Sequence, residues 1–157
     1  NDRLGTACYA WTYILHRTLC INNRFTEGIY FEDTDWTPRM LLNVKRIAST
    51  DRIVYNYLVR EGSITNAVNR SKQKKLLEDK VRLLRTLVEM RREMRGKGGW
   101  FDRMIAATVL SMGGLLAGAF WKERNAYLKR IEEMDVYPMC TAGSTPSAKK
   151  KIKLWMR

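Results

Sequence analysis

The sequence predicts an α/β chain that is mainly helical, with two or three short strands. Three observations support this fold class. Apolar residues recur every three or four positions across residues 67–95, which is typical of a long amphipathic helix. Residues 104–121 contain no charge, as expected of a buried helix. The runs "IYF" (29–31) and "RIVYNYLV" (52–59) are rich in β-branched and aromatic side chains, which favours strands.

The first half begins with residues 5–19, which mix aromatic and aliphatic side chains with few charges. A mostly buried helix is expected there. The first strand is followed by a helix that runs to about residue 48. Thr34 or Asp35 can cap this helix, and Pro38 is expected in its first turn, where a missing N–H does no harm.

The second half is predicted to be helical. The apolar face of its long helix is formed by residues at spacings of four, three and four: Leu77, Val81, Leu84 and Val88. The glycines of "GKGG" (96–99) end this helix. Another amphipathic helix is expected at residues 122–134, and a basic segment closes the chain.

Charge divides the chain into two regions. The formal net charge is +13; residues 1–65 contain 8 Lys/Arg and 7 Asp/Glu, whereas residues 66–157 contain 21 and 9. A basic surface of this kind suits an anionic membrane, a nucleic acid or a phosphorylated partner. One hypothesis is therefore a basic helical binding module, although no helix-turn-helix, RNA-binding or zinc-finger pattern occurs in the sequence.

Three cysteines, Cys8, Cys20 and Cys140, have no paired spacing, which favours a reducing, cytoplasmic compartment. Cys8, His16 and Cys20 do not match the spacing of a zinc site and lack a fourth ligand. His16 is instead expected at a packed or half-exposed helix position.

The uncharged run 104–121 has 18 residues, the lower limit for a membrane span. Gly114 and Gly118 form a small-xxx-small pair, which packs helices in membranes and in soluble proteins alike. A helix buried against protein is favoured over one inserted in a membrane, and both interpretations stay open. The basic second region is compatible with peripheral attachment to the inner face of the cell membrane, and equally with a solvated basic face.

Two acids, Glu32 and Asp33, follow the predicted strand 29–31 where a helix begins. The plainest interpretation is that they stabilise the helix N-terminus. Alternatively, a carboxylate at such a strand-to-helix junction can deprotonate a bound hydroxyl. Arg60 and Ser63 follow the second strand; their side chains either bind phosphate or are simply solvated in a loop.

The order of the motifs along the chain resembles that of a known enzyme family. An aromatic segment precedes "FTEGIYFEDTDW" (25–36), a helix follows, and then comes "YNYLVREGSIT" (55–65). This arrangement resembles the C-terminal half of the catalytic domain of inverting family 2 glycosyltransferases with the GT-A fold. Within that family it is most similar to bacterial enzymes that build capsular or other surface polysaccharides. The resemblance covers residues 1–70 and continues more loosely into the helical tail.

The resemblance implies a reaction for the two acids. Asp33 occupies the position of the catalytic base, and Glu32 helps to shape the acceptor site. The enzyme would move a sugar from a nucleotide-sugar donor to a hydroxyl of a glycan or lipid-linked glycan. Asp33 would take the proton of that hydroxyl, and the nucleoside diphosphate would leave from the opposite face.

Other positions take roles from the same resemblance. Trp36 and Trp11 would line or support the acceptor side, and Arg60 and Ser63 would bind the donor diphosphate. The family uses Mg²⁺ or Mn²⁺, which a D-x-D motif holds in the preceding half of the domain. The run "DTD" (33–35) has the letters of this motif, but it overlaps the pair Glu32–Asp33 and not the family's metal-binding position. No metal ligand is therefore expected in this chain.

Residues 1–65 would then be the acceptor-side part of the catalytic domain, and residues 66–157 a basic helical C-terminal region. The chain begins without Met and ends at "KKKIKLWMR", so we expect it to be a piece of a longer enzyme. Alone it would be inactive, because the half that binds nucleotide and metal is missing. An exposed sheet edge would favour pairing with a second copy, and nucleic acid is not an expected partner.

Overall fold

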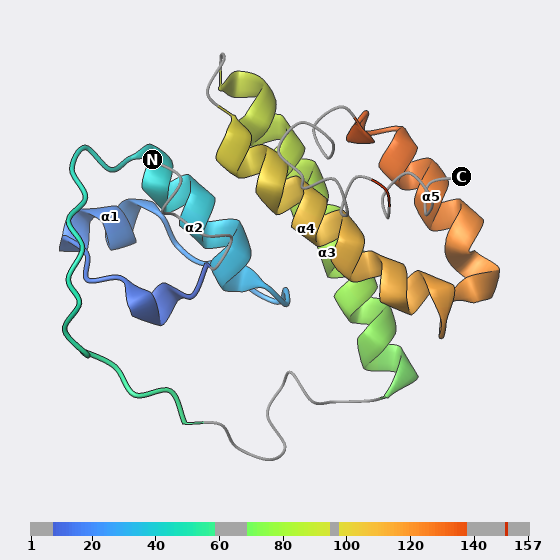
Figure 1. The fold of residues 1–157 in the computed structure, drawn as a ribbon, viewed down its shortest axis with the longest axis horizontal. Helices are drawn as coiled ribbons and strands as arrows, with labels where there is room; N and C mark the ends of the chain where they lie inside the picture. The colour runs from blue at the N-terminus through green and yellow to red at the C-terminus, as the bar shows by residue number, and fades with distance from the viewer. Residues whose placement is uncertain (1–7, 59–68, 95–97, 138–149, 151–157) are drawn as a thin grey trace.

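The computed structural model describes residues 8–58, 69–94, 98–137 and 150 (Figure 1). Within these residues the regular structure is helical, which confirms the prediction of a mainly helical chain. In chain order the elements are η1 (Ala10–Thr12), α1 (Arg17–Asn22), α2 (Glu32–Leu42), α3 (Arg70–Glu93), α4 (Gly99–Ala117), η3 (Trp121–Glu123) and α5 (Arg124–Glu132).

The predicted strands are wrong for the part of the chain that is described. Residues 29–31 and 52–58 contain no strand. A strand is stable only when a neighbouring strand pairs with its backbone, and no such neighbour is found among the described residues. The backbone N–H of Tyr30 instead donates to Oδ2 of Asp79 on α3, at 2.8 Å.

Helices α3 and α4 form the core of the molecule and run side by side in opposite directions (Figure 1). The long predicted helix is confirmed as α3, and its predicted apolar face is buried at all four positions. The side chains of α4 that pack against it include Met104, Ile105, Val109 and Met112. Helix α2 packs against α3, and the segment that contains η3 follows α4 directly and packs against it.

The uncharged run 104–121 forms most of α4 and then turns at Phe120, which is itself buried. Burial of α4 in the core supports the interpretation of a packed helix. Taken singly, none of the helices in the described ranges has the length and apolar character of a membrane span. Only α4 together with residues 121–132 meets those criteria, and that pair is bent by 119°.

A charged cluster attaches α5 to α3. Glu78 of α3 accepts hydrogen bonds from both terminal nitrogens of Arg130, at 3.0 and 2.9 Å. The hydroxyl of Tyr127 donates to the same carboxylate at 2.5 Å. The predicted helix at 122–134 is thus present as η3 and α5.

The N-terminal segment differs from its prediction. The described residues of the predicted helix 5–19 contain only the single turn η1 and the beginning of α1. Trp11 and Ile14 are exposed, so this segment is not a mostly buried helix. His16 is an exposed N-cap of α1, and its Nδ1 accepts the backbone N–H of Thr18. Because the apolar residues lack a regular helical spacing, composition alone was misleading here.

Helix α2 also differs from its prediction, since it begins at Glu32 and ends at Leu42. Its N-cap is Phe31, which has φ 65° and provides no side-chain cap. Asp35 is buried within the helix, so it does not cap it, and Pro38 lies beyond the first turn. The chain enters α2 through a left-handed residue, a conformation that sequence pattern does not reveal for phenylalanine.

Candidate functional site

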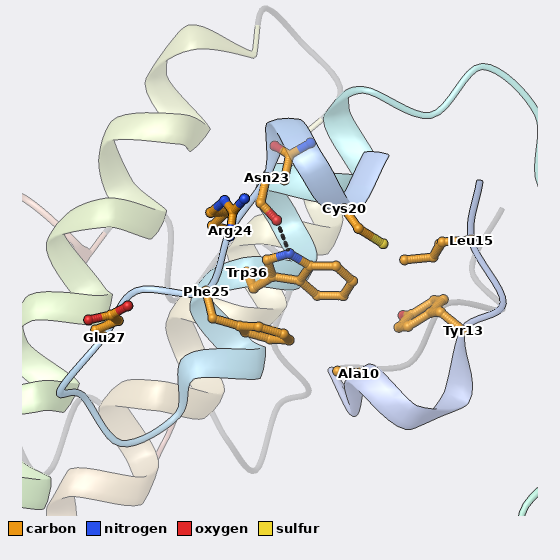
Figure 2. Close-up of a pocket in the computed structure, with 9 residues that line it drawn as sticks. All are labelled: Ala10, Tyr13, Leu15, Cys20, Asn23, Arg24, Phe25, Glu27 and Trp36. Carbon is orange, nitrogen blue, oxygen red and sulfur yellow. Dashed lines mark hydrogen bonds between the residues drawn. The ribbon is translucent and has the colours of Figure 1, made fainter. Parts of the chain in front are cut away.

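A cavity of about 540 Å³ lies between the N-terminal segment and α2 (Figure 2). Its wall combines aromatic and aliphatic groups with a few polar ones, a composition common in small-molecule sites. The lining residues are Ala10, Tyr13, Leu15, Cys20, Asn23, Arg24, Phe25, Glu27 and Trp36.

Trp36 forms a fixed wall of this cavity, and only 3% of its surface is exposed. Its indole Nε1–H donates to the backbone oxygen of Asn23 at 2.6 Å, as Figure 2 shows. The ring of Phe25 stacks on the indole with a centroid separation of 4.9 Å. Phe25 is 46% exposed, so its ring is the apolar face that a ligand ring can reach, and the buried indole lies behind it.

Helix α2 also holds in place the loop whose residues Arg24 and Phe25 line the cavity. Oδ2 of the buried Asp35 accepts hydrogen bonds from the hydroxyl of Thr26 at 2.7 Å and from Nη2 of Arg39 at 2.6 Å. Arg39 reaches further, to the backbone oxygen of Arg24 at 3.2 Å. These contacts tie residues 24–26 to the helix, so the position of Phe25 depends on α2.

Asp33 lies one helical turn before Trp36 and is half-buried. Burial raises the pKa of its carboxyl group, and the negative charge of Glu32 acts in the same direction. Hydrogen bonds from Thr34, whose hydroxyl lies 3.2 Å from Oδ1, oppose this effect. A carboxylate whose pKa is raised accepts a proton more readily than an ordinary aspartate does.

Cys8 lies close enough to Asp33 and to Tyr13 for their charges to affect one another. Burial raises the pKa of the Cys8 thiol to about 12, and the nearby charge of Asp33 contributes to the shift. Burial raises the pKa of Tyr13, which lines the cavity, and the thiolate that Cys8 forms only at high pH acts in the same direction. The thiol of Cys8 therefore stays protonated near neutral pH, and Asp33 is the group nearby that can accept a proton.

The structure brings together only some of the predicted site residues. Trp36 lines the cavity, and Asp33 lies near it without being part of the wall. Glu32 is exposed to solvent at the start of α2. The predicted diphosphate-binding residues, Arg60 and Ser63, lie outside the described residues.

Trp11 is not part of the cavity wall. It belongs to an aromatic stack with Tyr9, Tyr55 and Tyr57, at centroid separations of 5.1, 4.7 and 5.5 Å from Trp11 respectively. The stack joins the N-terminal segment to residues 55–57, which are far away in the sequence. Of the two tryptophans predicted to line or support the acceptor side, Trp36 lines the described cavity and Trp11 lies outside its wall.

Sequence reasoning did not assign Phe25, Tyr13 or Asn23 to the site, although all three line the cavity. Phe25 and Tyr13 were visible only as members of aromatic stretches. Asn23 contributes through its backbone oxygen, for which side-chain identity gives no signal. The stacking of Phe25 on Trp36 depends on the loop, so no periodicity in the sequence could indicate it.

Within the described ranges, no group of three His, Cys, Asp or Glu residues is placed to hold a metal ion. Comparison of the chain with protein-family models, with curated proteins and with solved structures gives no match.

Proposed function

We propose that this chain is the acceptor side of an inverting glycosyltransferase that transfers a sugar from a nucleotide-sugar to a hydroxyl of a glycan. The observation that carries the proposal is the position of Asp33. A half-buried carboxylate with a raised pKa lies one helical turn from Trp36, which forms the wall of an aromatic cavity. Aromatic faces suit sugar rings, and a nearby base suits a sugar hydroxyl.

In the proposed mechanism, the acceptor sugar packs against the Trp36 and Phe25 wall. Asp33 removes the proton of the reacting hydroxyl as its oxygen attacks the anomeric carbon of the donor. The bond from that carbon to the nucleoside diphosphate breaks on the opposite face, so the configuration is inverted. Asp33 then gives up its proton to solvent, which restores the base.

The proposal places the donor and the divalent cation on a preceding nucleotide-binding half with the mixed sheet of the GT-A fold. No described residue is assigned to the donor or to the cation. The motif order at 25–36 and 55–65 supports this wider arrangement. A role in bacterial surface polysaccharide synthesis at the inner face of the membrane belongs to the same proposal.

The test is a transfer assay on the intact enzyme, with release of nucleoside diphosphate measured with and without acceptor glycans. Asp33→Asn should lower the acceptor-dependent rate by about 10²–10⁴-fold, the usual contribution of a general base. Donor binding, measured separately by calorimetry, should change little.

The matched control is Asp51→Asn, which removes an exposed acid outside the cavity. This variant should keep the activity, because Asp51 neither lines the acceptor cavity nor takes part in proton transfer. Unchanged turnover in Asp33→Asn would remove Asp33 as the base. A wild-type enzyme that releases no acceptor-dependent nucleotide from any sugar donor would contradict the proposed reaction.

A further inference from the structure

A second cavity, of about 380 Å³, is lined by residues of α3 and α5 and is distinct from the aromatic cavity. Its wall is almost entirely charged. The lining residues are Glu78, Asp79, Val81, Arg82, Arg85 and Arg130. A polar hollow of this kind suits a small charged ligand rather than an apolar one.

Both acids in this wall already have cationic partners. Glu78 receives the two hydrogen bonds of Arg130, and this contact is the main reason that its pKa is lowered. Oδ2 of Asp79 accepts from Nζ of Lys75 at 2.7 Å and from the backbone N–H of Tyr30 at 2.8 Å. Each carboxylate is thus compensated by a cation from the protein.

Arg82 and Arg85 differ from these paired groups. Their side chains are exposed, and neither guanidinium has a hydrogen bond or ion pair with another residue in the described part of the chain. Residues three positions apart on a helix face the same side, so the two groups can act on one ligand. Lys74 adds a further charge, since it lies close enough to help lower the pKa of Glu78.

The net charge of the side chains in and around this cavity is therefore positive. Five cations, namely Lys74, Lys75, Arg82, Arg85 and Arg130, surround two carboxylates that are already paired. Arginine matches the oxygens of phosphate groups with two parallel N–H donors, which lysine does not. Because Glu78 orients Arg130 through a bidentate contact, part of this wall is held in place before a ligand arrives.

We propose that this cavity binds a phosphate-type anion through Arg82 and Arg85, with Arg130 at its edge. Two sources share that chemistry: the phosphate of an anionic lipid headgroup, and the phosphates of a soluble diphosphate. The proposal does not depend on the glycosyltransferase assignment, since it uses neither Asp33 nor the aromatic cavity.

The first experiment titrates the full chain with inorganic pyrophosphate by calorimetry at low ionic strength. Wild type should bind it saturably with one ion per chain. Arg82→Ala/Arg85→Ala should bind about tenfold more weakly, a loss of about 1.4 kcal/mol. The matched control, Arg46→Ala/Arg52→Ala, removes the same charge from exposed positions outside α3 and should leave binding unchanged.

A conservative pair separates arginine geometry from charge. Arg82→Lys/Arg85→Lys keeps both positive charges but loses the paired donors, so binding should be intermediate. Circular dichroism should show the same helicity in all variants, because the substituted side chains are exposed. The proposal is overturned if wild type shows no saturable binding, or if both alanine pairs weaken binding equally.

The second experiment identifies the source of the phosphate. The same variants are sedimented with phosphatidylcholine vesicles that contain or lack phosphatidylglycerol. A lipid site predicts binding only to the anionic vesicles, its loss in Arg82→Ala/Arg85→Ala, and competition by pyrophosphate. A soluble ligand predicts equal vesicle binding by both alanine pairs, while pyrophosphate still binds to wild type.

Discussion

At the scale of single residues, Asp33 and Asp35 show how two nearby acids differ in their contacts. Asp35 is buried and accepts hydrogen bonds from Thr26 and Arg39, which occupy its carboxylate. Asp33 has no ion pair in the described structure, and burial raises the pKa of its carboxyl group. Because a proton acceptor needs an accessible lone pair, Asp33 is the better candidate for a base.

The thermal stability of the fold should depend on whether the carboxyl group of Asp33 is protonated. Its raised pKa means that the folded chain holds this proton more tightly than the unfolded chain does. The ionised carboxylate therefore opposes folding at neutral pH, and this cost disappears as the pH falls through the folded pKa. Asp33→Asn should raise the midpoint of thermal unfolding at pH 7, with a smaller difference near pH 4. A lower midpoint at pH 7 would contradict this account.

Sequence predicted the site only in part at this scale. Trp36 was assigned to an acceptor surface and does line the cavity. Asp35 was expected to cap α2. Its carboxylate instead accepts hydrogen bonds from Thr26 of the preceding loop and from Arg39 one turn later. Trp11 was predicted to line or support the acceptor side; it stacks with tyrosines outside the cavity wall. Such partners come from segments distant in sequence, so spacing gave no sign of them.

At the scale of elements, an ion pair joins the C-terminal part of α3 to the first turn of α4. Asp102, in the first turn of α4, is 4% exposed and accepts from Nε of Arg91 on α3 at 2.7 Å. A Cβ added at Gly98 would lie 1.9 Å from that same Nε. The glycine therefore leaves space for the arginine, and any larger residue would push it away from Asp102.

Removing the arginine should leave a buried charge without a partner. We expect Arg91→Ala to lower the free energy of unfolding by about 3 kcal/mol, measured by urea denaturation. The exposed Arg85→Ala is the control and should change it by less than about 0.5 kcal/mol. Adding Asp102→Asn to Arg91→Ala should restore part of the loss, since the stranded charge is gone. Equal effects of Arg91→Ala and Arg85→Ala would show that the buried contact is unimportant.

Helices were predicted better than strands for a physical reason. The face formed by Leu77, Val81 and Leu84 is a local pattern, and its burial in α3 followed directly. The strand-like composition of residues 52–58 is also local, but a strand requires a partner elsewhere in the chain. No described segment supplies that partner, so composition alone overestimated the sheet.

At the scale of the whole molecule, the nearly neutral first region is attached to the basic second one just before the candidate base. Lys75 donates to the backbone oxygen of Gly28 at 2.7 Å, next to the contact between Tyr30 and Asp79. Nζ of Lys80 lies 4.2 Å from the centroid of the Phe31 ring. These contacts fix the segment that leads into α2.

The charge division seen in the sequence thus has a structural consequence. Lys75 and Lys80 of α3 contact the segment 28–31, and Arg82 and Arg85 remain for an anion. Sequence showed that the second region is basic, but it could not show which cations are already paired. That distinction depends on the contacts of Glu78 and Asp79, which only the folded chain reveals.

The most direct test of the central claim, that Asp33 is the base of a sugar transfer, is the pH dependence of kcat/KM for the acceptor in the intact enzyme. A base must be ionised, so the rate should fall about tenfold per pH unit below its pKa. The account predicts an acidic limb whose midpoint lies above 3.8, the ordinary value for aspartate, because burial raises the pKa of Asp33. A rate that stays constant down to pH 4 would contradict it.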